Sequence, residues 1–471
     1  MQLVAYGAQD IYLTGNPQIT FFKVVYRRHT NFSMEAIKQK FSGTIGHGSK
    51  VTSTISRNGD LIHNMWLECT LQTDIDHYEG LSLLNQVDLE IGGQLIDSHN
   101  YRFMHGYIRS FHTEDQIKII SSLTKTEYSN KSDIIIPLYF WFCKDPGLSL
   151  PLIALQYHEV KLYVTFSNYL RYYNSHFNNG DHSESKETKT FDDAKLWVNY
   201  IYLDTDERRR FAQVSHEYLI EQVQVIEKSL SPCGSTPISK NIELHFNHPV
   251  KYLMWYIGES SSDINSNKCI NNSVVLKDAI IRLNGHDRFK KQDFDYFANY
   301  QYYQHGLGNR IQNNSKLIDS PPNYIKYDAF GNELYKDLDN SETSQSYRYI
   351  LQKKINCHEG LDQLAKYKED TQINSVFEKG GGVLYYLYSF ALKPKEHQPS
   401  GTCNFSRIDN AELTISYKST LYKRMHLDSD GQNYKVKTPL ELNDTPTIHI
   451  FAVNYNVLRI MSGMGGLAYS N

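Results

Sequence analysis

The feature that most constrains the fold is a series of short apolar segments that runs twice along the 471-residue chain. The segments are rich in β-branched and aromatic residues and are bounded by Gly, Asn, Asp or Pro, which is the pattern of β-strands. The first series comprises residues 19–28, 61–71, 87–96, 134–141, 160–166 and 196–203. The second comprises residues 220–226, 242–246, 250–257, 279–283, 383–392, 413–417 and 448–458. With one helical pattern, at residues 104–123, the chain is predicted to be all-β.

The two series match each other in order, beginning with a pair of strand centres and a pair of turns. Met-Trp lies in mid-segment at Met65 and again at Met254. About thirty residues later each half carries a two-residue turn, Gly-Gly at Gly92 and Asn-Gly at Asn284. Both dipeptides tolerate the positive φ that tight hairpin turns require. The turn chemistry therefore repeats along with the strands.

Two further matches follow in the same order. An aromatic segment that runs into a Lys and Pro turn occurs at residues 138–147 and again at 387–396. The triplet Val-Asn-Tyr occurs at 198–200 and again at 453–455. Four matches in one order favour the duplication of a single β-domain, with the boundary near residues 212–217.

The predicted architecture is two tandem eight-stranded jelly-roll barrels (a double jelly roll) with short helices and long surface loops. An N-terminal arm at residues 1–18 precedes a first jelly roll at 19–215 and a second at 216–471. The second contains a long surface insertion at about residues 300–382, far longer than ordinary loops. Viral shells, lectins and cupins all use jelly rolls, so the fold alone does not choose a function.

Composition excludes several classes of protein. Lys plus Arg is 49 and Asp plus Glu is 52, a formal net charge of −3, so no direct nucleic-acid binding is expected. The longest apolar stretch, residues 134–143, is about half the length that a membrane-spanning helix needs. Residues 1–10 lack the pattern of a secretory signal, and the six cysteines are too dispersed for a disulfide scaffold. We therefore expect a cytosolic protein with reduced thiols.

Two local patterns approach the motifs of catalytic or metal sites and fall short of them. Gly147, Ser149 and Pro151 approach a nucleophile elbow, but the second Gly is missing and a strand pattern follows in place of a helix. His245 and His248 are three residues apart, so on a strand their rings point to opposite faces and do not converge on a metal. No catalytic, cofactor-binding or metal-binding residue is predicted, no cofactor is expected, and the chain is not expected to be an enzyme.

Basic and glycine-rich runs also have structural interpretations. The three arginines at 208–210 directly follow acidic residues within 204–207, so we expect an intramolecular ion-pair cluster and not a phosphate site. The run Arg-Arg-His at 27–29 is expected at a solvated strand end, with inner-shell partners as the alternative. The glycines within 463–466 have too little chain after them to open a dinucleotide-binding helix. We expect them to permit close contact between backbones.

The sequence as a whole resembles the major capsid proteins of the nucleocytoplasmic large DNA viruses, most closely those of large algal viruses and their giant-virus relatives. The runs that carry the resemblance in the first half are QLVAYGAQDIYLTGNPQITFFKVVYRRHTNF at 2, SRNGDLI at 56, LEIGGQLID at 89, PGLSLPLIALQYHEVKLY at 146 and LDTDERRRFAQVSHEYLIEQ at 203. Those in the second half are FNHPVKYL at 246, LNGHDRF at 283, LYSFALKP at 387, QPSGTCNFSRIDNAEL at 398 and NYNVLRIMSGMGGLAYSN at 454.

The resemblance implies a structural protein that forms a homotrimer of pseudo-hexagonal outline, the capsomer of an icosahedral shell. It implies neighbouring capsomers, minor capsid proteins and penton proteins as partners, proximity to an internal viral membrane, and assembly in a cytoplasmic virus factory. Asn-x-Ser/Thr triplets begin at Asn31, Asn130, Asn271, Asn313, Asn404 and Asn443. Some members of the family are glycosylated, so modification of these triplets stays open.

Two alternative functions stay open at this stage. A carbohydrate-binding or carbohydrate-processing jelly roll could use some of the 36 tyrosines as stacking platforms. A minor capsid protein of the same kind of virus would share the location in the virion. The tandem repeat and the long family-like runs favour the major capsid protein over both.

Overall fold

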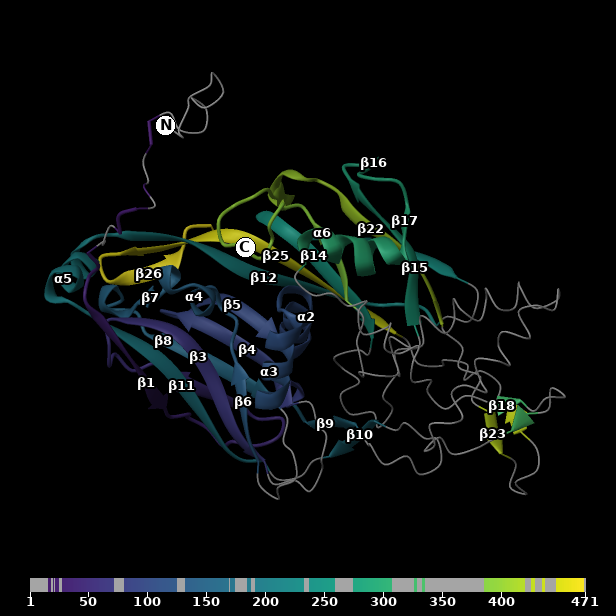
Figure 1. Cartoon of the computed structure of the whole chain (residues 1–471), viewed down its shortest axis with the longest axis horizontal. Coiled ribbons are helices and arrows are strands. Elements are labelled where there is room, and N and C mark those ends of the chain that lie inside the picture. The colour runs from purple at the N-terminus through teal and green to yellow at the C-terminus, as the bar shows by residue number, and fades with distance from the viewer. Residues whose placement is uncertain are drawn as a thin grey trace, which may run out of the picture.

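The computed structural model describes residues 16–17, 20, 22–24, 28–71, 80–124, 132–168, 170–173, 184–187, 191–232, 237–258, 274–306, 326–327, 333–334, 385–419, 425–427, 434–436 and 446–469. Most of their regular structure is β-strand, arranged in two halves that lie side by side (Figure 1). The all-β prediction is therefore confirmed. No helix among these residues is long and apolar enough to cross a membrane.

The first half holds two facing sheets. One has the order β1-β11-β3-β6, with the short β7 paired to β3, and the other has the order β2-β8-β4-β5. The strands are β1 (Phe32–Gln39), β2 (Lys50–Thr54), β3 (Leu61–Leu71), β4 (Leu84–Ile91), β5 (Gln94–Asn100), β6 (Ser132–Pro137), β7 (Leu150–Pro151), β8 (Val160–Phe166) and β11 (Phe191–Leu203).

The second half repeats this arrangement. Its sheets have the orders β12-β25-β14-β20 and β13-β22-β15-β16, and β21, β26 and β17 add to their edges. The strands are β12 (His216–Ser229), β13 (Ile238–Glu243), β14 (Pro249–Gly258), β15 (Val274–Leu283), β16 (His286–Asp287), β17 (Gln292–Asp293), β20 (Tyr386–Ser389), β21 (Cys403–Asn404), β22 (Ala411–Ser419), β25 (Thr447–Met461) and β26 (Met464–Leu467). In both halves the last long strand lies between the first strand and the third, so the duplicated strand order is as predicted.

Short helices and three small strand pairs complete the described elements. The helices are η1 (Gly80–Leu83), α2 (Tyr101–Phe111), α3 (Glu114–Thr124), α4 (Trp141–Lys144), η2 (Pro146–Leu148), η3 (Leu152–Ala154), α5 (Thr205–Gln213), η5 (Tyr296–Tyr300), α6 (Gln301–His305) and η6 (Phe405–Arg407). The pairs are β9 (Leu170–Tyr173) with β10 (Glu184–Glu187), β18 (Lys326–Tyr327) with β19 (Glu333–Leu334), and β23 (Met425–Leu427) with β24 (Tyr434–Val436).

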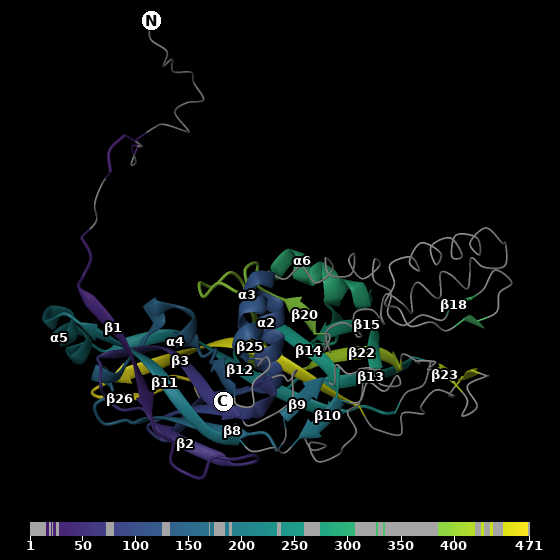
Figure 2. The same cartoon turned by 60° about the horizontal axis from the view of Figure 1, so that its bottom comes forward.

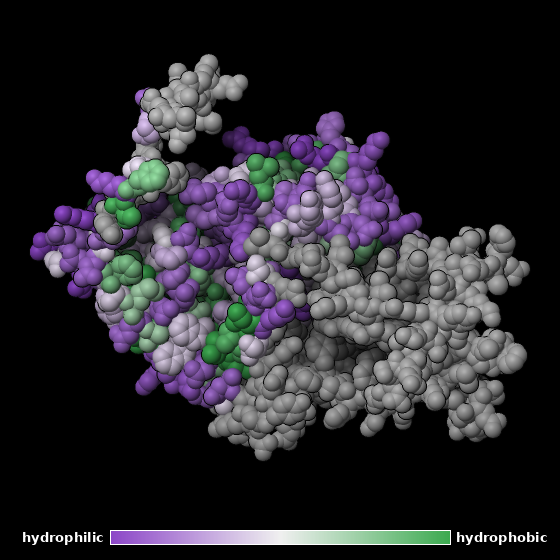
Figure 3. Space-filling view, in the orientation of Figure 1, coloured by the Kyte–Doolittle hydropathy of each residue, from purple (hydrophilic) through white to green (hydrophobic). Residues whose placement is uncertain are grey.

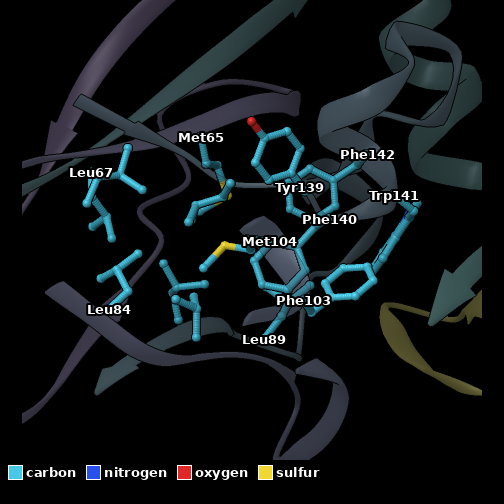
Figure 4. Close-up of a cluster of buried hydrophobic side chains, with 14 of the residues drawn as sticks. Met65, Leu67, Leu84, Leu89, Phe103, Met104, Tyr139, Phe140, Trp141 and Phe142 are labelled. Carbon is cyan, nitrogen blue, oxygen red and sulfur yellow. The ribbon is translucent and has the colours of Figure 1, made fainter. Parts of the chain in front are cut away.

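Apolar residues fill the space between the two sheets of the first half, and Phe103 and Met104 of α2 lie among them (Figure 4). Asn100 ends β5 and begins α2, because its side chain accepts a hydrogen bond from Phe103 N at 2.8 Å. The cap directs Phe103 and Met104 inward, and both are fully buried. Trp141 and its aromatic neighbours extend the same core.

The sheet that contains β14 and β25 is buried on both faces. Tyr252 and Met254 of β14 pack into the core of the first half, whereas Leu253 and Trp255 pack into the core of the second half. A strand covered on both sides has no need of polar residues at alternate positions. This burial explains why residues 250–257 read as a nearly continuous apolar run.

The repeated Met-Trp pair does not occupy equivalent positions, although the strand order repeats. In β3, Met65 is in the core and Trp66 is half-buried on the opposite face, stacked on Trp197 with ring centroids 6.2 Å apart. In β14, Met254 faces away from the core of its own half and Trp255 points into it. A one-residue offset along a strand exchanges its two faces. The match at Met65 and Met254 therefore locates equivalent strands but not equivalent residues.

Several predicted boundaries were wrong for local reasons. The described residues of 19–28, namely Thr20, 22–24 and Arg28, lie in no strand, and the first strand is β1, whose first five residues are exposed and show no buried face. The predicted helix at 104–123 is two helices, because the chain is extended at His112. The segment predicted at 134–141 ends as a strand at Pro137 and continues into α4.

The two predicted hairpin turns are confirmed. Gly92 and Gly93 have φ of 58° and 85° between β4 and β5, and Asn284 and Gly285 have φ of 52° and 77° between β15 and β16. The predicted insertion at 300–382 lies almost entirely outside the described residues. Its first residues form the end of η5 and α6, and the pair of β18 with β19 is also described. Residues 1–15 of the predicted arm lie outside them as well.

Candidate functional site: the junction between the two halves

The residues that approached catalytic or metal motifs have structural contacts. Ser149 Oγ donates a hydrogen bond to Pro146 O at 2.6 Å, and Asp145 accepts one from Gly147 N, so this segment is a capped turn. His245 is exposed and lies 3.1 Å from Glu243, whereas His248 is buried in a turn with a φ of 64°. Within the described ranges, no group of three or more His, Cys, Asp or Glu side chains is placed to hold a metal ion.

The arginine run forms an ion pair with a partner that the sequence did not indicate. Arg208 Nε lies 2.9 Å from Asp60 Oδ1, and Asp60 Oδ2 accepts a hydrogen bond from Leu203 N. The pair is intramolecular, as expected, but its acid comes from the turn before β3 and not from residues 204–207. Of the run 27–29, Arg27 lies outside the described residues, and Arg28 and His29 are exposed. Of the Asn-x-Ser/Thr triplets, those at Asn31 and Asn404 are described, and both asparagines are exposed.

A glycine permits a close approach between the two halves. Gly106 lies in α2, and a Cβ atom there would come within 2.6 Å of the Tyr385 ring and 2.8 Å of the Met254 methyl group. Hydrogen bonds cross the same contact: Tyr385 OH donates to Arg102 O at 2.8 Å, and Ser110 Oγ lies 3.1 Å from Tyr302 OH. Helix α2 therefore packs directly on the doubly buried sheet.

Three charged side chains meet in the interior of this junction. Glu221 of β12 lies 2.8 Å from Lys144 of α4 and 2.5 Å from Lys251 of β14. The Lys251 side chain is 1% exposed, and its ammonium also donates to Glu396 O at 2.9 Å. Lys144 lies over the Tyr107 ring at 4.6 Å, and Lys251 lies over the Tyr455 ring at 5.0 Å. We call Lys144, Glu221 and Lys251 the junction triad.

Attraction to the two lysines holds Glu221 in its charged state. Burial alone would raise the pKa of Glu221, but attraction to Lys144 and Lys251 and the hydrogen bonds from both outweigh it and lower the pKa to about 2. Burial lowers the pKa of Lys251 more than Glu221 raises it. At Lys144 burial lowers the pKa most strongly, but the attraction to Glu221 and Tyr107 together with the hydrogen bond to Glu221 outweighs it, and the pKa is raised.

The low pKa of Glu221 predicts a loss of stability in acid. The pKa of Glu221 in the folded chain is below its ordinary value of 4.5. Its contribution to the free energy of unfolding is therefore complete above pH 4.5 and disappears as the pH falls towards 2. The shift corresponds to about 3 kcal/mol. Denaturant unfolding of the wild-type chain and of Glu221→Gln at several pH values checks this. Between pH 4.5 and 2, the free energy of unfolding should fall more steeply with decreasing pH in the wild type than in Glu221→Gln. Equal slopes would contradict the prediction.

Two further sets of contacts join the halves. In the middle of β5, Asp97 accepts a hydrogen bond from Val223 N of β12 at 3.0 Å and lies 2.9 Å from the buried His99. In the second set, the hairpin of β25 and β26 lies against the first half. Tyr157 N donates to Gly463 O at 2.9 Å, and a Cβ atom on Gly465 would come within 2.6 Å of Leu155. The glycines at 463–466 thus permit the close backbone contact that their sequence predicted.

The triad was missed at the sequence level, although a signal was present. Lys251 stands inside an otherwise apolar strand segment, and Glu221 follows directly on Ile220 at the start of another. A charged residue inside a fully buried strand requires a partner of opposite charge. The partners come from three separate elements, so their identity could not be read from spacing along the chain.

Each half of the chain matches a model of a known protein family. Residues 20–204 match the model described as the N-terminus of the major capsid protein. Residues 207–310 and 380–466 match the model described as the large eukaryotic DNA virus major capsid protein.

Two curated relatives match over their whole length. The chain is 42% identical to the major capsid protein of Pyramimonas orientalis virus and 40% identical to that of Paramecium bursaria Chlorella virus 1. Each alignment covers 100% of this chain and 99% of the relative.

Solved structures show the same likeness. A chain of the quasi-atomic model of the PBCV-1 virus capsid superposes with a TM-score of 0.68 at 33% identity, over 96% of this chain and 100% of that one. The Faustovirus major capsid protein superposes with a TM-score of 0.58 at 11% identity, over 97% of this chain and 94% of that one, which is a likeness in fold.

Proposed function

This chain belongs to the major capsid proteins of large eukaryotic DNA viruses, and from that premise we propose that three copies form a pseudo-hexagonal capsomer of the icosahedral shell. The observation that carries the proposal is the duplicated strand order within one chain. Three chains with two similar barrels each place six barrels around a threefold axis, which gives a nearly six-sided tile. The protein is therefore a structural component of the virion.

The division of the chain follows from the same proposal. The N-terminal arm at 1–18 precedes a first barrel at 19–215, and the second barrel occupies 216–471. Helix α5 lies between β11 and β12 and thus provides the connection. The junction triad and the packing of α2 hold the two barrels of one chain in a single relative orientation, as a tile requires.

The partners of such a capsomer are neighbouring capsomers, minor capsid proteins and penton proteins, above an internal membrane and without direct contact to nucleic acid. Assembly takes place at a cytoplasmic virus factory. The protein needs no catalysis for this role, and its relatives are known as capsid proteins. A carbohydrate-binding jelly roll would have no need of the second barrel or of the buried junction.

Association into trimers is testable with purified protein. Light scattering at micromolar concentration should return about 164 kDa, three times the chain mass of 54.7 kDa. Negative-stain class averages should show particles with a nearly hexagonal outline. A stable species of one chain mass would contradict the capsomer and favour a lectin-like or minor capsid role.

A further inference from the structure

An exposed apolar surface lies at one end of the molecule, where the two halves meet. Tyr157 of the first half is 75% exposed, and Met461 and Met464 of the second half are 48% and 51% exposed. We call these three residues the terminal patch. Figure 3 shows apolar side chains gathered at this end, over β26.

Hydrogen bonds bring the three residues together. Met461 and Met464 face each other across the hairpin of β25 and β26, and Tyr157 N donates to Gly463 O between them. The Gln94 side chain of β5 accepts a hydrogen bond from Leu467 N at 3.1 Å, which holds this hairpin against the first half. The terminal patch is thus a defined surface that exists only when both halves are folded together.

The segment before β1 also carries exposed apolar side chains. Phe22 and Val24 are 99% and 74% exposed, and the described residues ahead of β1 lead away from the body (Figure 2). Residues 19–28 have the composition of a strand, yet their described members lie in no strand. Exposed aromatic and β-branched residues in such a segment indicate a surface that binds another protein.

The described residues ahead of β1 and the terminal patch lie at the same end of the molecule. Phe32, the first residue of β1, pairs with Leu203, and α5 begins two residues later. Helix α5 contacts η3, which ends three residues before Tyr157. Ten residues separate Phe22 from Phe32, so Phe22 can lie at most about 33 Å from the start of β1.

We propose that Phe22 and Val24 of one copy dock on the terminal patch of a neighbouring copy. The occupant is a second copy because the described residues ahead of β1 lead away from the body of their own chain and carry the almost fully exposed ring of Phe22. Methionine and tyrosine suit this role, since flexible thioether side chains adapt to an aromatic ring and contact it favourably. The inference rests on the proposed function, because it requires self-association.

The test is photo-crosslinking in the full chain. Phe22 is replaced by p-benzoylphenylalanine, and the irradiated protein is analysed by denaturing gel and mass spectrometry. A band of at least two chain masses is expected, with crosslinks on Tyr157 or on the hairpin of Met461 and Met464. Met461→Lys combined with Met464→Lys should reduce that band about tenfold. The matched control is Leu392→Lys, a 75% exposed leucine in the segment after β20, which should leave the band unchanged.

The outcomes separate this inference from the trimer itself. Crosslinks within one chain, or crosslinks between chains at another surface, overturn the docking. A light-scattering mass of three chains without any crosslink between chains also overturns it, while the capsomer stands. A mass of one chain overturns the capsomer and the docking together. Equal loss of the band in Leu392→Lys would show that added charge, and not the terminal patch, decides the yield.

Discussion

Replacing Glu221 by leucine is expected to lower the free energy of unfolding by about 3–5 kcal/mol. The substitution leaves Lys144 and Lys251 facing each other without an anion. Lys144 is one-fifth exposed and can turn towards water, but Lys251 is 1% exposed and keeps only the Glu396 carbonyl and the face of Tyr455. The loss is measured as a shift of the guanidinium unfolding curve at pH 7.

The matched control removes all three charges at once. Lys144→Met, Glu221→Leu and Lys251→Met together should recover most of the stability that Glu221→Leu loses, because an apolar replacement of a complete buried ion group is often neutral. If the single variant loses less than about 1 kcal/mol, the charges are better solvated than the geometry indicates. If the triple variant is folded but no longer forms trimers, the junction triad orients the barrels as well as stabilising them.

Replacing Trp255 by alanine is expected to cost about 3–5 kcal/mol, because it empties the centre of the second core. Trp255 is fully buried and contacts the rings of Phe297 and Tyr386. Trp66, the matched residue of the sequence repeat, is half-buried and stacks on Trp197. Trp66→Ala should therefore cost less, about 1–2 kcal/mol, because it loses the stacked pair and only part of a buried side chain.

Comparing these two variants tests whether Trp66 of β3 and Trp255 of β14 lie on different faces of their strands. Both variants delete the same side chain from a Met-Trp pair, so composition and local sequence are nearly matched. Guanidinium unfolding followed by circular dichroism gives both losses on one scale. Equal losses would mean that the two tryptophans occupy equivalent places and that the repeat extends to single residues.

Much of the strand order and both hairpin turns could be predicted from sequence, because their signals are local. Gly92 with Gly93 and Asn284 with Gly285 adopt the positive φ that their residue types tolerate. The segment at 19–28 shows the limit of this reasoning: strand composition does not produce a strand where the described residues have no neighbouring strand to pair with. Helix α2 was located, but its separation from α3 was missed, although Thr113 and Gln116 form a capping box that starts α3 directly after the extended His112.

By itself the sequence determined that this protein would build one β-domain twice, since turn residues and strand patterns act over a few neighbouring positions. Only the tertiary structure decided which face each strand of the shared sheet presents to which core. A strand buried on both sides has no alternation to reveal its orientation, so Met254 and Trp255 could not be assigned in advance. Likewise, the position of Lys251 inside an apolar segment indicates a buried charge. Glu221 and Lys144, which surround that charge, come from elements that only folding brings together.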